Sequence, residues 1–146
     1  MQLSLSQLFL IALSCSPALA APTPAKSMMV ANTEWTIENM KRVCNDDDTE
    51  CTWTFGINTG SGNATDCTYV VEGRPASEAN GGPSECTPYT ITSGWSDQFG
   101  PENGFTTLSV VNEETRQIIW PAYTDVQLDG GEVVTPDQSY APAALP

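Results

Sequence analysis

The sequence predicts an all-β protein: a single domain of about seven or eight short antiparallel strands, closed by two disulfides. Apolar and polar residues alternate with a period of two in several segments, and turn residues separate these segments. No segment after residue 20 has the period of an amphipathic helix. We expect a small antiparallel β-barrel, with a two-sheet sandwich as the alternative, because both architectures hide strand edges.

The strongest strand prediction is residues 51–58, CTWTFGIN, in which every second side chain is large and apolar. Residues 33–43 alternate in the same way, and the polar stretch 45–50, NDDDTE, separates the two segments. This arrangement predicts an antiparallel hairpin. Trp35 and Trp53 lie on the apolar sides of their strands, so we expect both in the core.

Later segments are predicted strands because Gly, Pro, Asn or charged residues bound each of them; they are residues 67–73, 88–95, 105–112 and 116–123. Residues 112–115 are predicted to form a hairpin turn. The last predicted hairpin pairs 123–128 with 132–136 across Asp129-Gly130-Gly131, where glycines tolerate the positive φ of a tight turn.

The first twenty residues have the pattern of a secretory signal peptide. An apolar stretch spans residues 8–13, and Ala18 and Ala20 are small residues at the two positions that signal peptidase reads. An apolar terminal helix is the alternative, because no Lys or Arg precedes the stretch. We expect residues 1–20 to be removed and the product to be secreted and extracellular. No membrane insertion is expected, since no later segment approaches the roughly 18 apolar residues of a membrane span.

The 126 residues that remain of the 146 are enough for one domain. Residues 21–33, rich in Pro, Ala and Ser, are predicted to be a flexible lead-in, residues 34–140 the single β domain, and residues 141–146 a flexible tail. All five basic and all eighteen acidic residues follow residue 20, so the product keeps the net charge of −13. Such a chain repels phosphate backbones, so we expect no nucleic-acid partner, and we expect a monomer.

Four of the five cysteines, Cys44, Cys51, Cys67 and Cys86, follow the predicted cut and form an even set in an oxidising compartment. Four cysteines allow three pairings. We favour Cys44 with Cys51 and Cys67 with Cys86, because each pair closes a polar, turn-like loop. A zinc site is disfavoured, since no close Cys-x-x-Cys pair occurs.

The chain has no histidine, which excludes Ser-His-Asp and Cys-His catalysis and the commonest transition-metal ligand. Carboxylate chemistry of the glycosidase kind survives, and Asp97 and Asp125 are the acids least like turn residues. Aspartates that accept backbone amides are the more ordinary interpretation. The acidic stretches 45–50 and 125–132 lack the spacing of an EF-hand loop. We therefore expect no catalytic residue, no metal and no cofactor.

Two surface features are also predicted. Asn63 begins the triplet Asn-Ala-Thr, an acceptor for N-glycosylation within a Gly-rich loop. Trp95, Trp120 and Tyr123 lie in or near turn-like stretches and are the aromatic residues predicted to form a binding surface. Such a surface suits a neutral cell-wall glycan, so an extracellular glycan-binding module is one candidate function.

Three stretches have an unusual sequence, namely CNDDDTECTWTFGIN at 44–58, FTTLSVVN at 105–112 and WPAYTDVQLDGGEVVTPDQSY at 120–140. They resemble a family of small secreted proteins of filamentous fungi that includes the hypersensitive response-inducing elicitors, one of them from the rice blast fungus. The resemblance implies a compact extracellular β-barrel that acts as a non-enzymatic effector. A plant would perceive it in the apoplast, through a cell-surface receptor or wall component, and answer with defence and local cell death. The resemblance assigns no role to any single residue.

Overall fold

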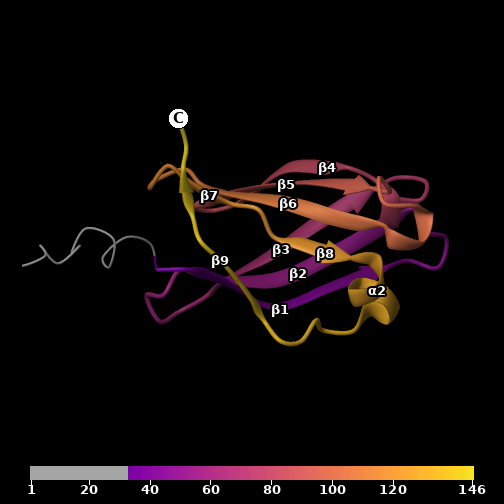
Figure 1. Cartoon of the computed structure of the whole chain (residues 1–146), viewed down its shortest axis with the longest axis horizontal. Coiled ribbons are helices and arrows are strands. Elements are labelled where there is room, and N and C mark those ends of the chain that lie inside the picture. Colours follow the sequence, from indigo (N-terminus) through magenta and orange to yellow (C-terminus); the bar gives the residue numbers. More distant parts are fainter. Residues whose placement is uncertain (1–32) are drawn as a thin grey trace, which may run out of the picture.

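Two antiparallel β-sheets pack face to face as a sandwich (Figure 1). The computed structural model describes residues 33–146, so the predicted signal peptide 1–20 and nearly all of the lead-in 21–33 lie outside the described residues. The all-β prediction is confirmed, and the structure selects the sandwich over the barrel that we expected. Among the described residues, no helix has the length and apolar character needed to cross a membrane.

The first sheet has four strands in the order β3-β2-β1-β9. Their bounds are Trp35–Cys44 for β1, Glu50–Asn58 for β2, Thr65–Glu72 for β3 and Gln138–Tyr140 for β9. The predicted hairpin is confirmed, because β1 and β2 pair antiparallel with Cys44 opposite Cys51. Trp35 and Trp53 are both buried, as their alternation predicts.

The second sheet has the order β10-β7-β6-β5-β4, and β8 also pairs with β6. Its strands are β4 Gly81–Cys86, β5 Tyr89–Ser96, β6 Phe105–Asn112, β7 Gln117–Ile119, β8 Ala122–Thr124 and β10 Ala143–Ala144. The predicted turn at 112–115 is confirmed, since the Asn112 side chain accepts the backbone N–H groups of Glu114 and Thr115 at 2.9 and 3.1 Å.

The core lies between the sheets and contains contacts that join one sheet to the other. Trp35 of β1 meets Tyr89 of β5 edge to face, with ring centroids 5.8 Å apart. The hydroxyls of Tyr69 in β3 and Ser93 in β5 share a buried hydrogen bond of 2.9 Å. This hydrogen bond forms only when Tyr69 and Ser93 lie opposite each other. It therefore fixes the relative position of the two sheets, which apolar contacts alone would not.

Both predicted disulfides are present, Cys44–Cys51 and Cys67–Cys86. They have different structural roles. Cys44 and Cys51 lie opposite each other at the closed end of the β1–β2 hairpin. The second bridge joins β3, the outer strand of the first sheet, to β4, the outer strand of the second. It is therefore the covalent link between the two sheets.

The predicted last hairpin is wrong. Residues 123–128 divide between β8 and a single helical turn, α2 (Asp125–Leu128), and residues 132–136 contain no strand. Thr124 and Gln127 form a capping box, in which each side chain bonds the other residue's backbone, and this local signal starts the turn. The positive φ expected after Asp129 is present, at 74° for Gly130 and 70° for Gly131.

Three short strands, β4, β9 and β10, were not predicted. The sequence of β4, GGPSEC, looks like a loop because Gly and Pro are poor strand formers, but pairing with β5 makes it an edge strand. Part of the predicted flexible tail 141–146 is ordered as β10, which pairs with β7. Three short 3-10 turns complete the described chain: η1 Ala76–Glu78, η2 Pro101–Asn103 and η3 Asp129–Gly131.

Removing the link between the sheets should cost more stability than removing the hairpin bridge. The Cys67–Cys86 bridge closes a span of 19 residues and the Cys44–Cys51 bridge one of 7, which corresponds to about 3 and about 2 kcal/mol in the chain-entropy model. The paired variants C67A/C86A and C44A/C51A are well matched, because each removes one buried and one half-buried cysteine. Urea unfolding should show the larger loss for C67A/C86A, and equal losses would contradict the distinct roles.

Stability should also fall in alkaline solution. Burial raises the pKa of all four tyrosines, Tyr69, Tyr89, Tyr123 and Tyr140, above the ordinary value of about 10. Below about pH 10 the tyrosines are protonated in both the folded and the unfolded chain, and their contribution to stability is fully present. Above that pH the unfolded chain releases protons that the folded chain retains, so the free energy of unfolding falls. Urea midpoints measured between about pH 8 and about pH 11 should decline above about pH 10, together with delayed tyrosinate absorbance. A constant midpoint would contradict this.

Candidate functional site

The three aromatic residues predicted as a binding surface do not share one exposed face. Tyr123 is the middle residue of β8 and is only 1% exposed, so its prediction as a surface residue is wrong. The alternation of β8 turns its ring between the sheets, where burial, Tyr140 and Asp137 raise its pKa. Trp95 is half-buried at the end of β5, and Trp120 is 52% exposed just before β8.

Trp95 belongs to a polar network centred on Asp125. The indole Nε1 of Trp95 donates to Oδ2 of Asp125 at 2.9 Å, and an Arg42 guanidinium nitrogen donates to Oδ1 at 3.4 Å. Arg42 is 7% exposed, donates a second bond to the Ser77 carbonyl at 3.1 Å, and lies 5.5 Å from the Trp53 ring centroid. Asp125 is thus the counter-charge of a buried cation. Each carboxylate oxygen of Asp125 already accepts a hydrogen bond, so this side chain has a structural role.

Gly104, the residue before β6, makes the network possible. Its φ of −60° suits any residue, so the reason for glycine is space. A Cβ at this position would lie 2.3 Å from Oδ2 of Asp125 and 3.0 Å from the Trp95 ring. The Gly104 carbonyl also accepts the Asp125 backbone N–H at 2.9 Å. These contacts attach the β5–β6 loop, residues 97–104, to helix α2.

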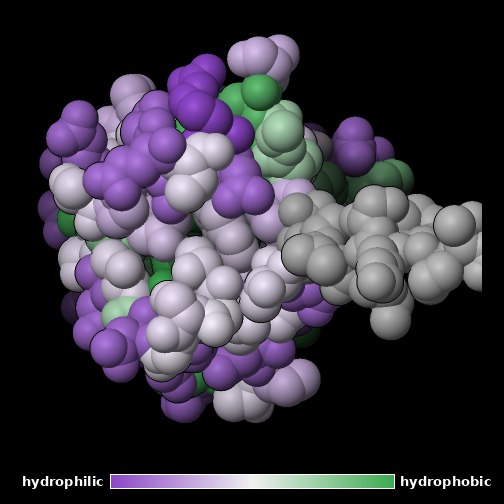
Figure 2. Space-filling view, turned by 90° about the vertical axis from the view of Figure 1, so that its left-hand side faces the viewer, coloured by the Kyte–Doolittle hydropathy of each residue, from purple (hydrophilic) through white to green (hydrophobic). Residues whose placement is uncertain are grey.

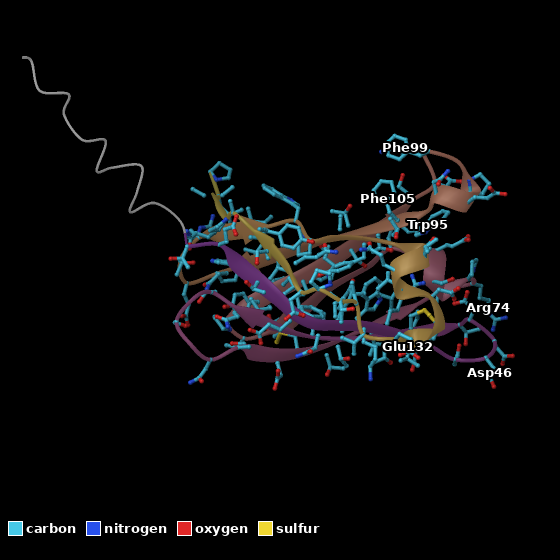
Figure 3. The ribbon with its side chains drawn as sticks, turned by 60° about the horizontal axis from the view of Figure 1, so that its bottom comes forward. Asp46, Arg74, Trp95, Phe99, Phe105 and Glu132 are labelled. Atoms are coloured by element: carbon cyan, nitrogen blue, oxygen red, sulfur yellow. A yellow bond between two sulfur atoms is a disulfide. The ribbon has the colours of Figure 1, made fainter. Side chains whose placement is uncertain are left out.

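An apolar patch lies beside this network. Phe99 projects from the β5–β6 loop with 68% of its surface exposed, and its ring stacks on that of Phe105 at a centroid distance of 5.8 Å. Figure 3 shows Phe99, Phe105 and Trp95 together at one end of the sandwich. Val126, next to Asp125 on α2, is 78% exposed. We call Trp95, Phe99 and Phe105 the aromatic patch.

Sequence reasoning missed Phe99 and Phe105 as site residues, although a signal was present. Phe99 stands in SDQFGPENG, a segment of turn residues where an aromatic side chain has no alternating strand to bury it. An aromatic in such a segment is expected on the surface. Phe105 was missed because an apolar residue at the start of a predicted strand does not indicate a surface position. In the structure it is the first residue of β6 and is only half-buried.

Negative charge gathers at the same end. The segments there, 45–50, 73–80, 97–104 and 125–134, contain ten acidic residues and one arginine. The segments at the opposite end, 33–34, 59–64, 87–88, 113–116 and 141–146, contain three acidic residues and one arginine. Asp46, Arg74 and Glu132 mark the lower side of the charged end in Figure 3. We call this region the acidic end, and the aromatic patch is part of it.

A cleft of about 460 Å³ opens at the acidic end between β1, η1 and η3, lined by Arg42, Asp48, Ser77 and Asp129 among others. The carboxylates that line the cleft already accept hydrogen bonds from neighbouring residues. The Asp48 carboxylate accepts the backbone N–H of Ser77 at 2.8 Å as well as the Ser77 hydroxyl, and Asp129 accepts the Gly130 N–H at 2.9 Å. These bonds shape the turns that form the cleft.

The cluster of Cys44, Asp48 and Cys51 has the proximity of metal ligands but not their chemistry, since the two cysteines form one disulfide and offer no thiolate. Asp97, the other candidate acid, is exposed, and its side chain makes no hydrogen bond within the described residues 33–146. Asn63 is exposed in the loop between β2 and β3, at the end away from the aromatic patch.

Fold and site define a class: a small, acidic, disulfide-bridged β-sandwich protein that presents an apolar surface on loops at one end. Comparison with known proteins places it more closely. The chain belongs to the Effector TSP1 family, whose model matches residues 36–145. It is 62% identical over 135 residues to Effector TSP1 of Hypocrea virens, an alignment that covers 91% of this chain and 92% of that protein. The resemblance seen in the sequence is thereby confirmed at the level of a fungal effector family.

The Asp125 network gives a direct test of the two candidate acids. Asp125→Asn leaves an acceptor for the Trp95 indole but removes the counter-charge of buried Arg42, and should lower the free energy of unfolding by about 2 kcal/mol. Asp97→Asn is the matched control and should change it by less than about 0.5 kcal/mol. Urea unfolding of both variants measures the difference. Equal, small effects would show that Asp125 does not stabilise Arg42.

Proposed function

We propose that this protein is a secreted, extracellular fungal effector that induces a hypersensitive response in plants by binding a host component, without catalysis. Membership of the Effector TSP1 family supports the effector role. The two disulfides agree with export, because such bonds persist in oxidising compartments. The observation that carries the binding proposal is the aromatic patch, in which Phe99 is 68% exposed on a loop held by hydrogen bonds.

Exposure of Phe99 has no benefit for folding, since an apolar ring in water loses the free energy that burial would give. The β5–β6 loop nevertheless holds it in a defined position. Gly100 donates to the Asp97 carbonyl at 2.7 Å, and the Asn103 side chain donates to the Phe99 carbonyl at 3.0 Å. A surface already ordered before binding loses less entropy on binding, which favours affinity. Aromatic residues at the centre of an interface commonly contribute most of the binding energy.

The charge around the patch indicates the chemistry of the partner. Ten acidic residues and one arginine in the segments of this end produce a negative field around an apolar centre. The complementary surface is a basic one with an apolar pocket or ridge at its middle. We infer a basic region of a plant cell-surface protein as the partner. Nucleic acid has the wrong sign of charge.

The placement of the candidate acids supports binding over hydrolysis. Glycoside hydrolysis needs two carboxyl groups that face each other across a substrate cleft, one of them free to protonate the leaving group. Asp125 has both oxygens engaged by Arg42 and Trp95, and Asp97 is exposed on the β5–β6 loop. The network therefore has the form of a structural ion pair.

A neutral wall glycan is the second candidate ligand, and the exposed indole of Trp120 favours it. The other two aromatic residues predicted for glycan binding are less suited to it. Tyr123 is buried in the core, and the indole N–H of Trp95 donates to Asp125. Retention of the protein on insoluble chitin or glucan, with loss of retention in Trp120→Ala, would support glycan binding in place of a protein partner.

Phe99→Ser should weaken the plant response strongly. The concentration of purified, oxidised protein needed for a half-maximal oxidative burst in infiltrated leaves should rise at least about tenfold, the change expected for a loss of about 1.4 kcal/mol of binding. Val70→Ser is the matched control, because Val70 is an exposed apolar residue on β3, outside the aromatic patch. It should respond like the unchanged protein.

Added salt should also raise the half-maximal concentration for the unchanged protein, since screening weakens attraction between a negative surface and a basic partner. Urea unfolding must show that Phe99→Ser remains folded. Equal responses to the Phe99 and Val70 variants would contradict the role of the aromatic patch. Absence of any burst or cell death across a range of host plants would contradict the effector proposal itself.

A further inference from the structure

We propose that Asn63 carries an N-linked glycan, and that this glycan covers the end of the sandwich opposite the aromatic patch. Asn63-Ala64-Thr65 is the one place in the chain where Asn, a residue other than Pro, and Ser or Thr follow in order. The hydroxyl residue of the triplet, Thr65, begins β3. The acceptor asparagine thus stands in a loop directly before an ordered strand.

The surroundings of Asn63 leave room for a large polar group. Asn63 is exposed, and its side chain makes no hydrogen bond within the described part of the chain. Its neighbour Gly62 has a φ of 106°, and no atom lies within 4 Å of the position where a Cβ would stand. The Gly62 position therefore faces open space, and attachment of a sugar at Asn63 breaks no side-chain hydrogen bond among the described residues.

The rest of this loop is held at its base. The Asn58 side chain accepts the Gly60 N–H at 2.9 Å, and the methyl group of Thr33 lies against Gly60. These contacts restrict the start of the loop, while Asn63 remains three residues further along, at the open tip. Asn63 thus differs from the other exposed loop asparagines, since the side chains of Asn45, Asn80 and Asn103 each form a hydrogen bond.

The position of the loop decides what a glycan at Asn63 would cover. Strand β2 runs from the acidic end to this loop, and its nine residues span about 26 Å at roughly 3.3 Å per residue. Figure 2 views the molecule from the end where the loop lies, and hydrophilic residues dominate that face. A glycan there extends from a polar surface and leaves the aromatic patch accessible. The importance of that accessibility rests on the proposed function of the patch.

The test is the mass of the full chain secreted from a filamentous fungus under its own leader, before and after treatment with an endoglycosidase. The unchanged protein should carry hexose-rich heterogeneity that the enzyme removes. Asn63→Gln should have the mass of the bare polypeptide, whereas Thr65→Ser keeps the acceptor triplet and should remain glycosylated. The mass of the unchanged protein decides the matter even if Asn63→Gln is poorly secreted.

A bare unchanged protein, in the medium or in the cells, would overturn the proposal, as would a glycan that persists in Asn63→Gln. The oxidative burst assay keeps this result separate from the effector proposal. Bare and glycosylated protein should elicit with half-maximal concentrations within about twofold of each other, since the glycan lies away from the patch. A difference greater than about tenfold would overturn the placement of the glycan away from the binding surface.

Discussion

The disulfide between Cys67 of β3 and Cys86 of β4 joins the outer strands of the two sheets and holds together one edge of the interface between them. β4 contributes mostly Gly, Pro and Ser to its sheet and provides little apolar area of its own. The disulfide compensates for that deficit by holding β4 beside β3. Internally, the Tyr69–Ser93 hydrogen bond then fixes how the sheets are aligned.

A rigid frame allows the two ends of the sandwich to differ. At one end, the buried guanidinium of Arg42 requires a counter-charge, and Asp125 provides it only because helix α2 begins at that residue. The same carboxylate takes the Trp95 N–H, and Gly104 leaves space for both groups. Asp125 therefore connects the buried cation to α2, to the end of β5 and to the β5–β6 loop that presents Phe99. At the other end, the loop that contains Asn63 has no comparable network among the described residues.

The parts of the fold that sequence could predict are those governed by local pattern. Strict alternation placed Trp35 and Trp53 in the core, and the loops between cysteines indicated the correct pairing. Strand β4 escaped prediction because its pairing with β5, and not its composition, makes it a strand. Tyr123 was wrongly predicted to lie on the surface because its neighbours in the sequence are typical of turns. It is the inward-facing middle residue of a three-residue strand. The aromatic patch could not be predicted as a unit, since contacts among distant segments assemble it.

The arrangement of charge and apolar surface separates two aspects of recognition. Long-range attraction depends on the many acids of the acidic end and acts on the rate of encounter, which salt reduces. Tight contact depends on the few apolar groups around Phe99, whose burial against a partner is short-ranged and insensitive to salt. Four of the ten acids share the 45–50 turn, and the other six are distributed over three further segments held by the cross-linked sandwich. The rigid frame thus permits a surface that a flexible acidic chain would not keep in place.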